Sequence, residues 1–264
     1  MSSLMNAVAN QPWMMMPDRL EMMAKIAKRE HDVDALAARV GSKLDNTRTV
    51  EMRGSIAVIP VIGGIYRYAN LFTEICGDTS TEMLAKEITS AADNRSVSHI
   101  VLNIDSPGGQ AAGISELSQL IRTASEKKPV IAYIDDLAAS AGYWIASSAN
   151  HIAASKTAMV GSIGAVYSFR LFDDGSEKIE IVSSVSPKKR PDIRTDEGKS
   201  QIQAWADKLG EIFVEDVAAN RGVTTDEVLQ RFGQGDLLIG SDALAAGMID
   251  EITTFEALIA ELQS

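Results

Sequence analysis

Three short segments of this sequence carry residue types that together suit hydrolysis of an amide bond. Ser140 stands in Ala139-Ser140-Ala141-Gly142-Tyr143, where strand-like sequence gives way to helix-like sequence. An earlier segment, Asp105-Ser106-Pro107-Gly108-Gly109, closes an apolar run, and a later one reads Gly161-Ser162-Ile163-Gly164. Amide hydrolysis requires a nucleophile, a base and donors for the tetrahedral oxyanion. The segments supply a serine nucleophile, a glycine turn and a second hydroxyl.

The oxyanion donors follow from two local geometries. If Ser140 opens a helix, the N–H of Ala141 belongs to the first turn and has no acceptor within that helix. Gly108 and Gly109 come directly after Pro107, and glycine N–H groups in such a turn can approach a carbonyl oxygen closely. Taken singly, the serine also fits helix capping or tight packing, and the glycines fit an ordinary turn. Their occurrence together, with one predicted helix and one predicted strand between them, favours a catalytic site.

The base of this site is harder to assign than the nucleophile. His31 lies in the N-terminal segment, and His99 and His151 lie at the starts of predicted strands, at the opposite end from Ser140. Each histidine is therefore expected to be structural. The pair Lys188-Lys189 follows a predicted strand and offers another base.

A lysine acts as a base only when it is neutral. With a reference pKa of ~10.4, neutrality at pH 7 costs about 4.6 kcal/mol, which burial and exclusion of water can offset. Ser162, in its glycine-flanked turn, could orient such a lysine by a hydrogen bond. The alternatives are an exposed basic loop for Lys188 and Lys189 and a turn-forming role for Ser162. The residues predict a serine protease with a Ser/Lys dyad rather than a Ser/His/Asp triad.

The composition argues against several other functions. The 264 residues carry a net charge of −11, which disfavours binding of nucleic acid through its phosphates. Cys76 is the only cysteine, so no intrachain disulfide can form. No His/Cys/Glu spacing indicates a metal site, and no cofactor is expected. No apolar run reaches the ~18–20 residues of a membrane span, so we expect a soluble, cytoplasmic protein without a membrane partner.

An α/β domain must position these catalytic segments. Residues 1–50 carry two helical patterns and predict an N-terminal helical arm. Its Met-rich start is either a flexible arm or a partner-binding surface, and the alternative is a helical pair packed on its own domain. Residues 51–264 alternate between strand and helix patterns with short turns, which predicts one domain around a mostly parallel sheet.

The hydrophobic pattern places the elements of this domain. Continuous apolar runs predict strands covered on both faces, whereas apolar residues three and four apart predict amphipathic helices. Strands are expected at 56–62, 100–104, 129–134, 151–153, 159–166 and 179–182. Helices are expected around 84–91, 114–124, 140–149, 196–220 and 227–231, with a further helix at the end of the chain.

The order of these motifs resembles the signal peptide peptidase family of Ser/Lys proteases, in the Clp protease/crotonase superfamily. Within that family the chain looks most like the phage head-maturation (prohead) proteases. The resemblance runs from about Gly54 to Leu262 and includes the segment from Gly240 to Asp250. It implies an α/β fold of repeated ββα units with a mostly parallel sheet.

The resemblance also implies roles for the site residues. Ser140 is the implied nucleophile, and Ser162 is implied to assist the lysine. Gly109 and Ala141 are the implied oxyanion donors, and Gly108 shapes the turn. Ala141 replaces a common glycine of the family, but alanine keeps the N–H that this role requires.

The lysine segment departs from the family pattern. The family places the lysine in a Ser-Gly-x-x-Lys segment, whereas this chain reads Ser184-Val185-Ser186-Pro187-Lys188-Lys189 and lacks the glycine. The register favours Lys188 over Lys189 as the base.

The resemblance implies partners as well. Family members form rings in which neighbouring subunits help to complete each site. For a phage member the implied substrates are scaffold and capsid-associated proteins of the immature head, and the protease itself, inside the prohead in the host cytoplasm. The alternatives are a bacterial cytoplasmic peptidase that degrades signal or other peptides, a crotonase-type acyl-CoA enzyme, and a non-catalytic ring scaffold.

Overall fold

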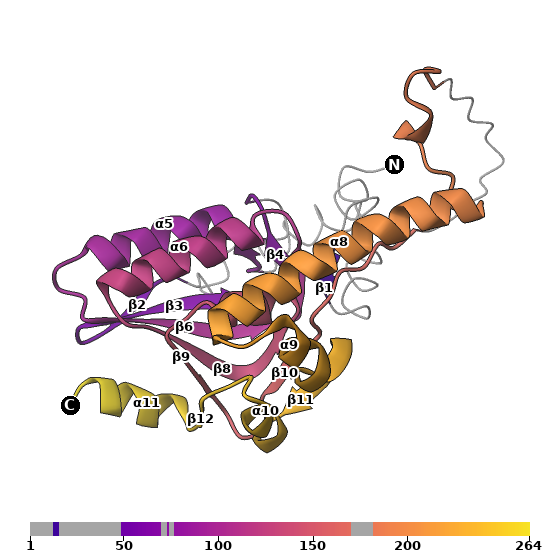
Figure 1. Cartoon of the computed structure of the whole chain (residues 1–264). Helices are drawn as coiled ribbons and strands as arrows, with labels where there is room; N and C mark the ends of the chain where they lie inside the picture. Colours follow the sequence, from indigo (N-terminus) through magenta and orange to yellow (C-terminus); the bar gives the residue numbers. More distant parts are fainter. Residues whose placement is uncertain (1–12, 16–48, 70–72, 74–76, 170–181) are drawn as a thin grey trace, which may run out of the picture.

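The computed structural model of the chain describes residues 13–15, 49–69, 73, 77–169 and 182–264. Eight strands form its larger sheet: β2 (Glu51–Arg53), β3 (Ile56–Ile62), β6 (His99–Ser106), β8 (Val130–Ala139), β9 (His151–Ala154), β10 (Met159–Gly161), β11 (Leu237–Ile239) and β12 (Glu251–Ile252). Six of them follow the order β11-β10-β8-β6-β3-β2, and β9 joins β8 to β12 (Figure 1).

Most neighbours in this sheet are parallel. β3 pairs with β6, β6 with β8, β8 with both β9 and β10, and β9 with β12, all in parallel. Only the edge pairs β2–β3 and β10–β11 are antiparallel. The prediction of an α/β fold with a mostly parallel sheet is confirmed.

A smaller sheet lies beside the carboxyl ends of β3 and β6. Its four strands are β1 (Trp13–Met15), β4 (Ile65–Tyr66), β5 (Thr79–Ser80) and β7 (Gly108–Gln110), in the order β1-β7-β4-β5. β1 runs antiparallel to β7, and β4 runs parallel to β7. The glycine turn predicted after the apolar run of β6 is thus itself a strand.

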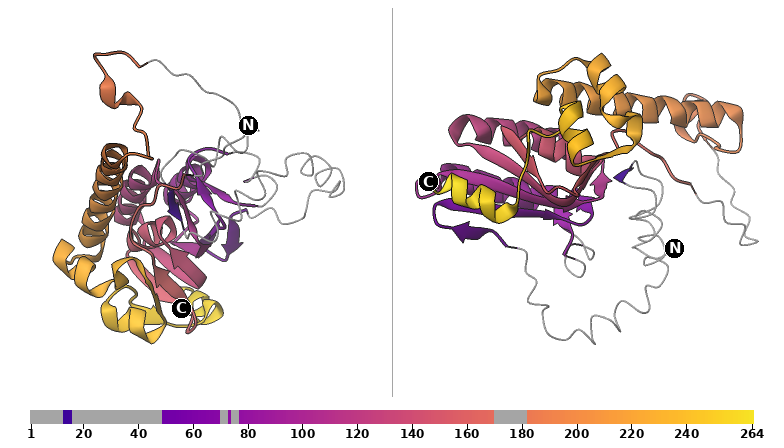
Figure 2. Two further views of the ribbon diagram at one scale, coloured as in Figure 1. Left: turned by 90° about the vertical axis from the view of Figure 1, so that its right-hand side faces the viewer. Right: turned by 90° about the horizontal axis from the view of Figure 1, so that it is seen from below.

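Helices cover both faces of the larger sheet. The helices are α5 (Thr81–Asp93), α6 (Ile114–Lys127), α7 (Ala141–Ser147), α8 (Asp196–Arg221), α9 (Thr225–Arg231), α10 (Ser241–Ala246) and α11 (Phe255–Leu262). Figures 1 and 2 show α5 and α6 on one face and α11 on the opposite face.

The alternation of side chains along β6 explains the apolar run of this strand. Ile100 and Leu102 belong to the large core under the helices α5–α8, whereas Val101 belongs to the smaller core under α11. A strand covered on both faces has no polar face, so its sequence is continuously hydrophobic.

The longest helix has clear start and stop signals. Thr195 caps α8 by accepting a hydrogen bond from the Gly198 N–H at 3.0 Å, and Gly222 ends the helix with a φ of +66°. Thr224 caps α9 in a capping box with Glu227. Both helices lie where the sequence predicted them, and α9 begins two residues earlier.

Several boundaries differ from the predictions. β8 extends to Ala139 instead of ending at 134, because β6 and β10 both supply it with partners. β10 ends at Gly161 instead of 166, because Ser162 has a φ of +54°, which no strand accommodates. The strand predicted at 179–182 falls almost wholly outside the described residues, and Val182 is not in a strand.

The predicted helical arm at 1–50 also lies mainly outside the described residues, so the proposed domain boundary near residue 50 remains a prediction. The three described residues of that region that form an element, 13–15, are a strand rather than a helix. In the described part of the chain, no helix combines the length and apolarity needed to cross a membrane.

Candidate active site

Ser140 links the end of β8 to the start of α7. Its backbone has φ +55° and ψ −120°, outside the regions that non-glycine residues ordinarily adopt. Such a conformation costs on the order of 1–3 kcal/mol and persists only where the surroundings enforce it. Here the Ser140 N–H donates to the Gly161 carbonyl at 2.7 Å, and the Ser140 carbonyl accepts from the Trp144 N–H at 3.0 Å.

Ser162 occupies the equivalent position on the neighbouring strand. β10 runs parallel to β8 with Gly161 opposite Ala139, so Ser140 and Ser162 each follow the carboxyl end of adjacent parallel strands. Ser162 also has a positive φ, +54°, and its N–H donates to the Asp236 carbonyl at 2.9 Å. The two serines that the sequence selected are therefore brought side by side.

The glycines of β7 complete this corner of the molecule. Gly108 has a φ of +99°, and a Cβ at this position would lie 2.9 Å from the Ser140 Cβ. A Cβ on Gly109 would lie 1.9 Å from the Ile65 carbonyl oxygen of β4. Both distances are too short for any side chain, so only glycine allows β7 to lie between β4 and Ser140.

The N–H groups around Ser140 differ in their partners. The Gly108 N–H donates to the Ser106 Oγ at 3.2 Å, and that hydroxyl donates to the Gly63 carbonyl at 2.6 Å. Ala141 is the first residue of α7, so its N–H has no acceptor within the helix. Ser106 is fully buried and fixes the turn through its two hydrogen bonds. The sequence analysis assigned it no role, although it lies in the segment 105–109.

β1 was not predicted, and it lies directly against this corner. Met14 is opposite Gly109 and Met15 is opposite Gly108 in the register with β7. A Cβ on Gly108 would lie 2.0 Å from the Met14 carbonyl oxygen, on the same side as the Ser140 Cβ. The only signal in the sequence was the run of methionines, which has neither strand nor helix periodicity.

Neither predicted lysine lies beside Ser140. Lys188 and Lys189 belong to a short 3-10 helix, Pro187–Lys189, and both side chains are exposed. The Lys188 carbonyl accepts a hydrogen bond from Gln201 in α8 at 2.8 Å. This segment stands away from the sheets, beyond the first turn of α8 (Figures 1 and 2). Within one chain the structure thus brings together Ser140, Ser162, Gly108, Gly109 and Ala141, but not the lysines.

The described histidines are also remote from Ser140. His99 is the first residue of β6 and His151 the first residue of β9, so both lie at the amino ends of strands parallel to β8, whereas Ser140 follows the carboxyl end of β8. His151 Nε2 lies 3.2 Å from a carboxylate oxygen of Glu251. His31 lies outside the described residues. Among the described residues no cluster of three or more His, Cys, Asp or Glu side chains could hold a metal ion.

An ion pair anchors the far end of α8 behind the site. Arg221 donates to the Gly247 carbonyl at 3.0 Å and to Asp250 at 3.1 Å. Partial burial raises the pKa of Asp250, but hydrogen bonds from Arg221 and the Ile152 N–H outweigh burial, so this pKa lies below its ordinary value. Burial raises the pKa of Tyr143, whose phenol in α7 donates to the Met248 carbonyl at 2.9 Å.

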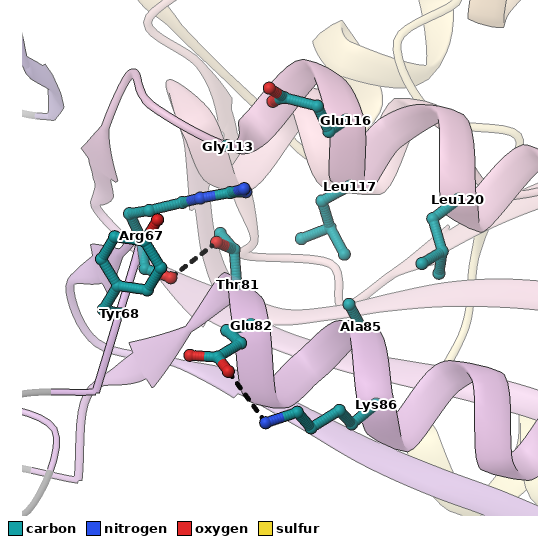
Figure 3. A pocket seen from close by; sticks show the side chains of 10 residues that line it. All are labelled: Arg67, Tyr68, Thr81, Glu82, Ala85, Lys86, Gly113, Glu116, Leu117 and Leu120. Carbon is teal, nitrogen blue, oxygen red and sulfur yellow. Dashed lines mark hydrogen bonds and ion pairs between the residues drawn. The ribbon is translucent and has the colours of Figure 1, made fainter.

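Two hollows on the surface lie near these elements. One, of about 360 Å³, lies between α5, α6 and the segment Arg67–Tyr68 (Figure 3). At its rim Thr81 donates to the Arg67 carbonyl at 3.1 Å. The other, of about 550 Å³, runs along α8 and α9 and includes residues 163–165, which directly follow Ser162. Ser140 lines neither hollow, and this residue is only 1% exposed.

Comparison with known proteins decides the family. The model of the family described as "Peptidase family S49" matches residues 122–264, more than half of the chain and including both serines. The chain belongs to peptidase family S49. The resemblance inferred from the motifs is thereby confirmed.

Similar proteins come from bacteria, phages, an archaeon and a plant. Protease 4 of Haemophilus influenzae is 31% identical over 81% of this chain and 35% of its own length. Capsid assembly protease C of Escherichia phage lambda is 28% identical over 78% of this chain and 48% of its own length. The chain therefore spans less than half of these two S49 relatives.

Among solved structures, a membrane-bound stomatin-specific protease, 1510-N, K138A mutant in complex with a substrate peptide, matches with a TM-score of 0.49 and 18% identity. The match covers 79% of this chain and 80% of that one.

Proposed function

We propose that this chain is a serine endopeptidase that uses a Ser/Lys dyad, with Ser140 as its nucleophile. The observation that carries this proposal is the backbone of Ser140. A buried, non-glycine residue with φ +55° at the carboxyl end of β8, enclosed by Gly108 and Ser162, is the kind of strain that functional sites retain. Membership of a peptidase family supports the same assignment.

The geometry supports a two-step acyl transfer. Ser140 Oγ attacks the peptide carbonyl while its proton passes to a neutral lysine, and the oxyanion accepts hydrogen bonds from the N–H groups of Ala141 and Gly109. The protonated lysine then gives its proton to the leaving amine. Water, deprotonated by the same lysine, attacks the acyl-enzyme, and Ser140 is released with its proton restored.

We propose that Lys188 supplies the base, with Lys189 as the alternative, and that Ser162 orients it. Because both lysines are exposed on a segment that stands away from Ser140, the lysine that serves one site comes from a neighbouring copy in a ring. Burial between copies would also favour the neutral amine that the mechanism requires.

For the substrate we propose scaffold and capsid-associated proteins of an immature phage head, within the host cytoplasm. Similarity to the capsid assembly protease of phage lambda supports this assignment. A second candidate is a bacterial peptidase that degrades leftover peptides, which the similarity to Protease 4 supports. Cleavage of a scaffold protein with no cleavage of short unstructured peptides would favour the phage role, and the reverse pattern would favour the bacterial role.

The first test is loss of cleavage on removing the nucleophile. Purified protein is incubated with an unfolded protein mixture, and new termini are read by mass spectrometry, beside Ser140→Ala. We expect cuts by the wild type and at least a ~1000-fold lower rate for Ser140→Ala, because the nucleophile is absent. Circular dichroism of both proteins controls for folding. Equal cleavage by both would refute the assignment of Ser140.

A further inference from the structure

β1 is bound to the larger body of the molecule as an added strand. Its three residues pair antiparallel with β7, with Trp13 opposite Gln110, Met14 opposite Gly109 and Met15 opposite Gly108. β7 is the strand whose glycines flank the nucleophile. The edge of β7 beside Ser140 is thus filled by a segment that lies more than ninety residues earlier in the sequence.

The side chains of Met14 and Met15 in β1 are buried against the rest of the molecule. Met14 and Met15 are 1% and 3% exposed, and Met14 belongs to the large hydrophobic core. A Cβ on Gly64 would lie 3.3 Å from the Met15 methyl carbon, so this side chain packs on the backbone that leads into β4. The Met14 carbonyl and the Ser140 side chain meet over the same face of Gly108.

We propose that β1 occupies the substrate-binding site of this chain. An extended polypeptide substrate would replace it as an antiparallel strand on β7 and place an unbranched apolar side chain, such as methionine, in the site that Met14 fills. The inference rests on the proposed peptidase function and adds to it a segment of this chain that fills the site. It also makes β1 an internal competitor of the substrate.

General physical chemistry supports this exchange. Peptides commonly bind proteins by adding a strand to an exposed sheet edge, where the main chain supplies hydrogen bonds and alternate side chains enter pockets. A tethered segment competes at an effective concentration on the order of millimolar, whereas a free substrate is more dilute. A three-residue strand at the edge of its sheet, with β7 as its only partner strand among the described residues, can nevertheless leave that edge by local opening.

A disulfide can lock β1 in place and test the proposal directly. We would combine Trp13→Cys and Gln110→Cys with Cys76→Ser and Ser140→Ala in the full chain. Directly opposed residues of an antiparallel pair have Cα atoms about 4.5–5.5 Å apart, within the range that a disulfide spans. Fluorescence anisotropy would measure binding of a labelled peptide with the sequence of residues 10–18 to the oxidised and reduced forms.

We expect the disulfide to form and the reduced form to bind the peptide at least tenfold more tightly than the oxidised form. The same peptide with aspartate in place of Met14 should bind the reduced form at least tenfold more weakly, because a charge would enter an apolar site. The single variants Trp13→Cys and Gln110→Cys, treated with the same oxidant, should show no change.

Failure to form the disulfide, equal binding by the two forms, or no binding to the reduced form would each overturn the proposal. Because these measurements use the Ser140→Ala background, they do not depend on catalysis. Labelling of Ser140 in the wild type by a fluorophosphonate tests the peptidase function separately. Normal labelling with no effect of the lock would refute the role of β1 alone, and absent labelling would count against the nucleophile alone.

Discussion

At the scale of single residues, the site depends on backbone conformations that side chains usually avoid. Ser140 and Ser162 both have positive φ angles, and each follows the carboxyl end of a parallel strand. The Gly161 carbonyl accepts a hydrogen bond from the Ser140 N–H, and the Asp236 carbonyl accepts one from the Ser162 N–H. These two hydrogen bonds hold both serines in place. This double strain marks the corner of the molecule where we place the chemistry.

Gly108→Ala should damage both the site and the fold. Its Cβ would lie 2.0 Å from the Met14 carbonyl oxygen and 2.9 Å from the Ser140 Cβ, at a φ of +99°. We expect a loss of about 1–3 kcal/mol in the free energy of unfolding, and at least a ~100-fold loss of peptidase activity because the nucleophile is displaced. Urea unfolding and cleavage of an unfolded protein measure the two effects.

Gly210→Ala is the matched control for this substitution. Gly210 lies in the interior of α8, and a Cβ there would meet no atom within 4 Å. The substitution should raise the free energy of unfolding by about 0.5–1 kcal/mol, because alanine favours helices more than glycine does. Similar behaviour of the two variants would show that the packing around Gly108 is not as close as described.

At the scale of elements, Arg221 and Asp250 connect α8 to β9. Asp250 accepts hydrogen bonds from the Arg221 guanidinium and from the N–H of Ile152, the second residue of β9. These bonds hold the pKa of Asp250 below its ordinary value in the folded protein. The ionised carboxylate therefore stabilises the fold, since the unfolded chain binds a proton more readily.

The pair should make stability depend on pH in the acidic range. Its contribution is complete above the unfolded pKa of Asp, ~3.9, and is lost as the pH falls through the lower folded pKa. We expect Asp250→Asn to be less stable than the wild type at pH 7, and this difference in urea midpoint to shrink as the pH is lowered below about 4. A difference that stays constant from neutral to acidic pH would contradict this view. Asp136→Asn, at an exposed position of β8, serves as the control.

The larger elements were predictable because their own residues specify them. The apolar runs of β3 and β6 and the cap of α8 at Thr195 are local signals, and the structure contains all three elements. β7 was not predicted as a strand because Gly108 and Gly109 have low strand propensity. It forms because β1 and β4 flank it, and β1 in turn depends on a partner far along the chain.

In the candidate site, too, some residues could be placed from the sequence and others could not. Ser140 and Ser162 were selected by motif, and the parallel register of β8 and β10 explains why they meet. The position of Lys188 could not be predicted in the same way. Residues 183–195 carry no periodic hydrophobic pattern that would specify their path, and Lys188 is exposed, so no core packing fixes its position.

At the scale of the whole molecule, the separation of the lysines from Ser140 predicts complementation between copies. Ser140→Ala and the double variant Lys188→Ala, Lys189→Ala should each be inactive alone. If a site combines the serine of one copy with a lysine of its neighbour, random mixing should restore about a quarter of the wild-type sites. The measurement is cleavage by the two variants unfolded together and refolded, beside each variant refolded alone.

Two outcomes would count against shared sites. A mixture that stays inactive while the wild type recovers full activity after the same treatment would place serine and base in one chain. Activity in the double lysine variant by itself would exclude both lysines as the base. If the double variant is inactive, testing Lys188→Ala and Lys189→Ala separately distinguishes which of the two the mechanism uses.

The stacking of Trp144 on Phe213 gives this protein a built-in optical probe. Trp144 lies in α7, one turn after Ser140, and its ring is 4.4 Å from that of Phe213 in α8 with an interplanar angle of 11°. The ring is almost fully buried, whereas Trp205 is 43% exposed. With Trp13 and Trp205 changed to phenylalanine, the emission wavelength of Trp144 would report how tightly α8 packs against α7. Assembly, inhibitor binding and mutation could then be followed in real time without an attached dye.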